Sequence, residues 1–263
     1  MRRSLVSLIA IGLFAAACSP DAPSPRPGSS VVTPPPAAPG AVVPEPGARI
    51  PREASALARE LEVTWTARRA AVDVWVGSGG TATWPPPDAV ELLVLREQQI
   101  YRLLASLHRL ADRVLDRVPA SLAAEALANV RAGAALYEHF TPLQEVPDFR
   151  TRPPQPADVL LGYFEAAEER FGVEWEVLAA VMLIETRMGR VISRSSAGAQ
   201  GPMQFLPATW DAYGLGGEVH EERDAVMGAA NYLVASGAPR DYPEALYHYN
   251  PVDAYVTAVI QYA

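Results

Sequence analysis

The chain contains an uncharged apolar run that ends in an acid, Val177-Leu178-Ala179-Ala180-Val181-Met182-Leu183-Ile184-Glu185. Read as a helix, the run carries apolar residues on two neighbouring stripes, Val177, Val181 and Ile184 on one and Leu178 and Met182 on the other. A helix that is apolar on two stripes is buried on most of its sides, so we expect this one to form the centre of a domain.

Glu185 continues the stripe of Leu178 and Met182, so its carboxyl projects from the same helix face as core residues. Burying a carboxylate is costly, and desolvation raises the pKa of such a group until it stays protonated near neutral pH. A protonated acid in a cleft suits cleavage of a glycosidic bond, because the leaving oxygen must take a proton. The alternative is structural: Glu185 reaches solvent, or it pairs with Arg187 or Arg190.

Helical spacing of apolar residues recurs through residues 157–263, where no alternating strand pattern is longer than four residues. We expect the central helix to end at Gly189 and a later helix to be capped by Asp224. Pro243 and Pro251 are expected to open the last two helices. The sequence therefore predicts an all-α domain over this range.

Residues 51–141 also read as helical, with helices predicted over 52–76, 88–118 and 121–140. We expect a helical bundle or hairpin region, either a separate helper domain or a platform packed on the second domain. Five prolines within residues 142–156 mark the boundary between the two parts.

The first residues are typical of an exported protein. Residues 1–17 combine a basic start with an apolar stretch that is too short to span a bilayer, which predicts a signal peptide. Cys18, the only cysteine, stands where the signal should end and resembles the lipidated cysteine of a bacterial lipobox. The alternative is an ordinary signal peptide with an incidental cysteine. Residues 18–50 are expected to form a proline-rich linker.

Charge and composition exclude several classes of function. The chain carries a net charge of −8, and the loss of Arg2 and Arg3 with residues 1–17 takes it to −10. This charge argues against a nucleic-acid binder, which would carry a basic surface. A single cysteine excludes an intramolecular disulfide and a cysteine-based zinc cluster. The four histidines lack the spacing of metal ligands, so we expect no metal and no cofactor.

Separated motifs follow one another in the second half of the chain. They are the pair Glu185-Thr186, the loop Gly198-Ala199-Gln200-Gly201-Pro202-Met203-Gln204, a helix that starts with Asp224-Ala225 and ends with Tyr232-Leu233, and the pair Tyr249-Asn250. In this order they resemble the signature of lytic transglycosylases of the lysozyme-like superfamily, over about residues 157–263. Pro202 and the Glu-Thr pair resemble the membrane-bound B type and its actinobacterial lipoprotein relatives.

The resemblance implies a role for each matching residue. Glu185 matches the catalytic acid and base, and Tyr249 and Asn250 match a pair that faces it across the cleft. Ser195 matches a serine near the reacting sugar, with Ser196 or Ser193 as alternatives because one extra residue separates Glu185 from the loop. Met203 and Gln204 match residues that line the glycan groove. Trp175, Trp210 and Tyr213 are further candidates for stacking on sugars, with core packing the favoured interpretation of Trp175.

The implied reaction cleaves the β-1,4 bond between N-acetylmuramic acid and N-acetylglucosamine and leaves a 1,6-anhydromuramyl end, with Glu185 as the single general acid and base. One alternative is a hydrolytic muramidase of the same fold, with a second acid from Glu218, Glu221, Glu222 or Asp224. Another is a non-catalytic scaffold lipoprotein that binds peptidoglycan. The expected partners are glycan strands, a membrane through the lipid on Cys18, and cell-wall synthesis or division proteins. We expect an exported protein that faces the periplasm or the cell wall.

Overall fold

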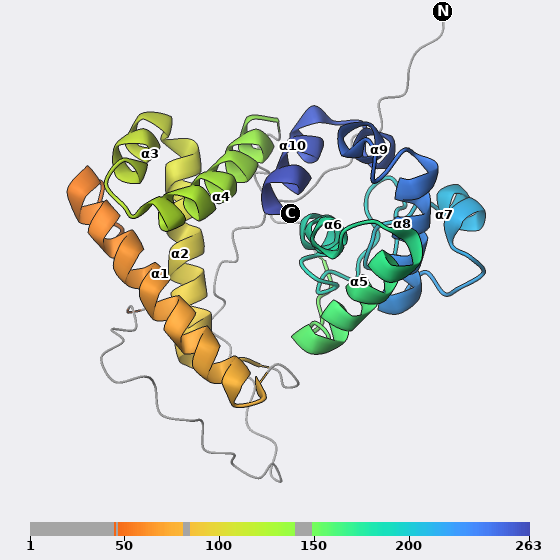
Figure 1. Ribbon diagram of the computed structural model, residues 1–263, viewed down its shortest axis with the longest axis horizontal. Coiled ribbons are helices and arrows are strands. Elements are labelled where there is room, and N and C mark those ends of the chain that lie inside the picture. The colour runs from red at the N-terminus through yellow and green to blue at the C-terminus, as the bar shows by residue number, and fades with distance from the viewer. Residues whose placement is uncertain (1–44, 46, 81–84, 140–148) are drawn as a thin grey trace, which may run out of the picture.

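The computed structural model describes residue 45 and residues 47–80, 85–139 and 149–263. This part of the chain forms ten helices and no strand, apart from two isolated bridges, which confirms the predicted all-α class. Figure 1 shows two groups of helices that meet where α4 lies beside α10. The predicted signal peptide, Cys18 and most of the linker lie outside the described residues. None of the described helices is both long and apolar enough to cross a membrane.

The first group contains four helices, α1 (Ala54–Gly77), α2 (Asp88–Ser106), α3 (His108–Leu115) and α4 (Ala120–His139). The prediction of one helix over 88–118 is wrong, because the chain leaves helical geometry at Leu107, which has φ −131° and ψ 70°. The break lets α3 fold back, so that α3 contacts α1 as well as α2 and α4.

The buried face of α2 includes an acid that the sequence pattern did not single out. Glu97 is only 4 % exposed, and it pairs with Arg68 of α1 and accepts a hydrogen bond of 2.7 Å from the Tyr101 hydroxyl. Arg68 also pairs with Glu125 of α4. Burial raises the pKa of Glu97, and the hydrogen bond from Tyr101 and the charge of Arg68 offset part of the cost of burying this carboxylate. This network ties α1, α2 and α4 together.

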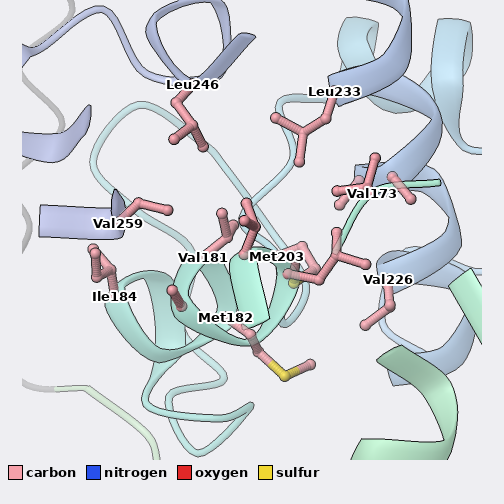
Figure 2. Packing of buried hydrophobic residues seen from close by; sticks show 14 of the residues in the cluster. Val173, Val181, Met182, Ile184, Met203, Val226, Leu233, Leu246 and Val259 are labelled. Atoms are coloured by element: carbon pink, nitrogen blue, oxygen red, sulfur yellow. The ribbon is translucent and has the colours of Figure 1, made fainter. Parts of the chain in front are cut away.

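The second group contains α5 (Ala157–Phe171), α6 (Trp175–Thr186), α7 (Pro207–Tyr213), α8 (Glu222–Ala235), α9 (Tyr242–Tyr249) and α10 (Asp253–Tyr262). As expected, α6 is the central helix, and its residues from both predicted stripes are buried, including Val177, Leu178, Val181, Met182 and Ile184. Figure 2 shows Val181 and Ile184 of this helix among core residues of the surrounding helices.

One helix of the first group belongs to the core of the second. Ala132 and Leu136 of α4 are 0 % and 4 % exposed and lie in the same hydrophobic cluster as α5, α6, α8 and α10. The N-terminal half of α4, with Leu122 and Ala126, instead lies in a separate cluster with α1, α2 and α3. Helix α4 therefore joins the two groups through two different cores.

Candidate active site

The site is built around the end of α6. The helix ends at Thr186, three residues before the predicted Gly189, because Arg187, Met188 and Gly189 all adopt left-handed backbone conformations. The amides of Arg187 and Met188 close this turn on the carbonyls of Leu183 and Met182. Glu185 thus stands in the last turn of α6, immediately before the chain reverses.

Thr186 fastens this turn to the glycine-containing loop. Its side chain is fully buried, its hydroxyl donates to the Pro202 carbonyl at 2.6 Å, and it accepts from the Gly189 amide at 3.0 Å. A single hydroxyl therefore fixes the end of the Glu185 helix relative to the loop that follows. Sequence reasoning noticed Thr186 only as part of a family motif and assigned it no physical role.

The loop itself is a tight turn closed by two backbone hydrogen bonds of 2.9 Å between Gln200 and Phe205. Gly201 has φ +76°, and a Cβ there would lie 2.0 Å from the Val219 carbonyl oxygen, so only glycine fits. Pro202 is part of this turn and opens no helix. Gln204 also has positive φ, 51°, and its side-chain amide donates to the Gly201 carbonyl at 3.0 Å.

Residues from the proline-rich boundary pack against the turn after α6 and the start of α8. Backbone hydrogen bonds join Arg152 to Arg190 and Ile192 to Arg150. The Arg152 guanidinium pairs with the buried carboxylate of Glu222 at the start of α8. A pocket of about 240 Å³ lies between this segment, Pro202 and His220. The segment 149–152 therefore packs against the turn after α6 and the loop at Pro202, and Glu185 is not among the residues that line this pocket.

The Glu185 side chain keeps part of its surface exposed, although protein surrounds most of the carboxyl. Burial raises the pKa of Glu185 to about 7, and the Tyr255 hydroxyl opposes this effect in part. Neither Arg187 nor any other arginine contributes to the pKa shift of Glu185, so the ion-pair alternative finds no support in this geometry. Near neutral pH the group can therefore both give and take a proton.

Two tyrosines face Glu185, and they differ in what their hydroxyls do. Tyr249 donates to the Met203 carbonyl at 2.7 Å, so its hydroxyl is already engaged. Tyr255 of α10 is fully buried, and its hydroxyl is the hydrogen-bonding group that acts on Glu185. That contact is loose, because the hydroxyl has no partner within strict hydrogen-bond geometry. The Glu185 charge raises the pKa of both tyrosines, after the larger effect of burial.

Sequence reasoning missed Tyr255. The signal that could have found it is its spacing from Tyr249 and Asn250, which places it in the first turn of the next helix. A largely apolar helix with two tyrosines reads as a core helix, however, and only the fold brings the Tyr255 hydroxyl to the carboxyl of α6.

The structure uses the other predicted site residues in different ways. Ser195 accepts from the Ala199 amide at 3.0 Å and stabilises a turn, while the alternative Ser193 accepts from Arg150. Met203 is fully buried, so its side chain packs in the core and does not line a groove as the resemblance implies. Asn250 is 2 % exposed, and neither polar atom of its side chain has a partner in the described part of the chain. A buried amide without a hydrogen-bond partner lowers the stability of the fold, and this is typical of a group that binds a ligand or water.

The aromatic candidates for sugar stacking are mostly structural. Added Cβ atoms on Gly214 and Gly228 would lie 2.5 and 2.8 Å from the Trp210 ring, so this ring is wedged between two backbone segments. Trp210 also packs edge-on against Phe205, with ring centroids 5.1 Å apart. Trp175 packs against the core, as favoured from the sequence. Tyr213 is partly exposed and lies 4.6 Å from Tyr232, centroid to centroid, and it remains available for stacking.

The described residues contain no group of three or more histidine, cysteine, aspartate or glutamate side chains that could hold a metal ion. The acids proposed as a second catalytic carboxylate are engaged or exposed. Glu222 pairs with Arg152, and Asp224 accepts from the Glu218 amide at 3.0 Å. Asp224 lies in the first turn of α8, whose N-cap is Glu221, so the prediction that Asp224 is the cap residue is wrong.

The raised pKa of Glu185 predicts a pH-dependent cost to stability. The folded protein binds this proton more tightly than the unfolded chain, whose ordinary value is 4.5, so stability falls as pH rises from about 4.5 through about 7. Glutamine does not ionise, so the free energy of unfolding of Glu185→Gln should rise by roughly 2–3 kcal/mol relative to that of the native protein as the pH goes from 5 to 8. Denaturant unfolding of both proteins at pH 5 and at pH 8 measures this change. The same difference in stability between the two proteins at both pH values would contradict the burial of the carboxyl.

Residues 162–251 match the family model described as "Transglycosylase SLT domain". No curated protein and no solved structure matched the chain. The matched range includes Glu185, the loop through Gln204 and the pair Tyr249-Asn250, and it ends before Tyr255. The order of the motifs, the all-α fold and the half-buried acid at the end of the central helix all agree with this match. Residues 162–251 of this chain form a transglycosylase SLT domain, consistent with a lytic transglycosylase of the lysozyme-like superfamily.

Proposed function

We propose that this protein is a peptidoglycan lytic transglycosylase that cleaves the N-acetylmuramic acid–N-acetylglucosamine β-1,4 bond and forms 1,6-anhydromuramyl ends. The family acts on peptidoglycan glycan strands. The observation that carries the proposal is the half-buried carboxyl of Glu185, whose pKa lies at about 7 with no second acid contributing to it. One group of this kind suits a reaction in which the same carboxyl gives and then takes a proton.

In the first step, protonated Glu185 gives its proton to the glycosidic oxygen, and the bond from the muramyl C1 to that oxygen breaks. The N-acetyl group of the substrate stabilises the positive charge that develops at C1. In the second step, the carboxylate takes the proton of the muramyl C6 hydroxyl, whose oxygen closes onto C1. Glu185 regains its proton, no water is consumed, and the acid is ready for another cycle.

The neighbouring hydroxyls support this cycle from the protein side. The Tyr255 hydroxyl can stabilise the carboxylate form between the two steps, since a hydrogen bond to the charged form lowers the cost of ionisation. The Tyr249 hydroxyl holds the Met203 carbonyl and thereby the loop that carries Gln204. Asn250 has free hydrogen-bonding capacity within the described part of the protein, which suits binding of a substrate amide.

A hydrolytic muramidase of the same fold is the second candidate. Such an enzyme needs a base or nucleophile besides the acid, commonly another carboxylate. Glu222 and Asp224 are held by Arg152 and the Glu218 amide, and none of the four candidate acids contributes to the pKa of Glu185. The observations therefore favour the transglycosylase.

Mass spectrometry of fragments released from purified peptidoglycan tests the choice. We expect the native protein to release muropeptides with anhydromuramyl ends, and Glu185→Gln to release at least about a thousandfold less, because its amide cannot transfer the proton. Reducing ends, heavier by one water molecule, would support the muramidase. Equal release by both proteins would remove Glu185 from the mechanism, and no release by a folded native protein would favour a binding role.

We also propose that the protein is exported and held to a membrane through lipid on Cys18, with the proline-rich segment as a spacer. The basic and apolar start and the position of the single cysteine support this. Two lipid signals are needed for stable anchoring, which a lipidated cysteine with several acyl chains supplies. We expect Cys18→Ser to move the protein from the membrane fraction to the soluble exported fraction. Unchanged membrane association would contradict the anchor.

A further inference from the structure

Helix α10 supplies Tyr255 to the site, but the helix is too short to be stable without contacts to other helices. It has ten residues, and helices this short are marginal in water without tertiary packing. Its location beside Glu185 must therefore come from the helices that pack against it. It also lies beyond the range 162–251 that matches the transglycosylase family.

Two helices hold α10 in place besides α9, which precedes it in the chain. On one side α6 packs against it, and Val259 of α10 and Ile184 of α6 belong to the same buried cluster, drawn in Figure 2. On the other side lies α4, and the contact between α4 and α10 is the most extensive between any two described helices. Ala132 and Leu136 of α4 share the buried cluster of Tyr255, Ala258 and Val259. In Figure 1, α10 lies between α4 and the rest of the second helix group.

A second contact links α4 to the end of the Glu185 helix. Arg187, which caps α6, lies largely out of water, and burial lowers its pKa. Its guanidinium lies close enough to Tyr262 of α10, Arg102 of α2 and Tyr137 of α4 for each to affect that pKa. The Arg187 side chain thus lies near residues of three helices, and two of these helices, α2 and α4, belong to the N-terminal group.

We propose that α4 is a positioning element of the active site: its C-terminal half holds α10, and through α10 the Tyr255 hydroxyl, against Glu185. The N-terminal helical group thereby takes part in catalysis through α4, while it contributes no group that touches substrate. The kinetic part of this inference rests on the proposed transglycosylase function. Small displacements of a positioned group are costly in catalysis, so loosening this contact should be visible in the chemical step.

Two leucines of α4 provide a matched pair of variants. Leu136 packs in the cluster of α10, whereas Leu122 on the same helix packs with α1 and α2, and both are buried. Leu136→Ala and Leu122→Ala each leave a similar cavity, so both lower stability, but only the first loosens the support of α10. If an alanine variant does not fold, the pair Leu136→Val and Leu122→Val makes the same comparison with a smaller cavity.

The first readout is the pKa of Glu185, measured on the full chain by ¹³C NMR of glutamate labelled at the side-chain carboxyl, with Glu185→Gln to assign the signal. Tyr255 of α10 and Tyr249 of α9 are the titratable groups that face this carboxyl. Because the Tyr255 hydroxyl lowers the Glu185 pKa, its loss in Tyr255→Phe should raise that pKa and set the upper limit. We expect Leu136→Ala to raise it by about half a pH unit or more, and Leu122→Ala to leave it unchanged.

The second readout is the release of anhydromuropeptides. We expect kcat to fall about tenfold or more in Leu136→Ala with KM within about twofold, while Leu122→Ala stays within about twofold in both. Equal pKa values and equal rates in the two variants would overturn the positioning role of α4. If the native protein releases no anhydromuropeptide, the proposed function fails, and the pKa comparison still decides whether α4 positions Tyr255.

Discussion

The site depends on one constraint: a carboxyl at the end of the most buried helix must be kept largely out of water without an ion-pair partner. Protein around Glu185 raises its pKa to about 7, and the Tyr255 hydroxyl opposes this in part. An arginine beside the acid would hold it ionised and useless as a proton donor at neutral pH. The fold avoids this by turning Arg187 away, toward Tyr262, Arg102 and Tyr137.

The surrounding architecture serves that arrangement. The left-handed turn after α6 lets the chain reverse immediately, and the buried Thr186 hydroxyl joins the turn to the Pro202 carbonyl. Gly201 is needed where the loop passes within contact of the Val219 backbone. The Arg152–Glu222 ion pair joins the segment 149–152 to the start of α8. These contacts hold the turn that follows Glu185. Their cost is strained backbone at Arg187, Met188 and Gln204 and the burial of the Glu222 carboxylate.

The sequence predicted those features that depend on local pattern. The two apolar stripes predicted the central helix, and the isolated acid at its end predicted a perturbed carboxyl. Local sequence pattern was less successful where tertiary contacts determine the end of a helix or the burial of a polar side chain. The break at Leu107 carries no proline or glycine signal. Glu97 lies on the buried face of α2, where Arg68 of α1 and the Tyr101 hydroxyl satisfy the acid.

The candidate site was predicted in part for a similar reason. Tyr249 lies near Glu185, but Met203 contributes a carbonyl instead of a side chain, and Ser195 stabilises a turn. Tyr255 and α4 escaped prediction because their relation to Glu185 exists only in three dimensions. A short helix at the end of the chain and a leucine far from the motifs give no local sign of a shared core.

The role of Glu185 as proton donor is tested most directly by titration of its carboxyl in the native protein, followed by ¹³C NMR from pH 4 to pH 9. We expect a midpoint at about 7, which makes the group protonated in a large fraction of molecules at neutral pH. A midpoint near 4.5, the ordinary value for glutamate, would show an ionised and solvated carboxyl and would contradict its role as the proton donor.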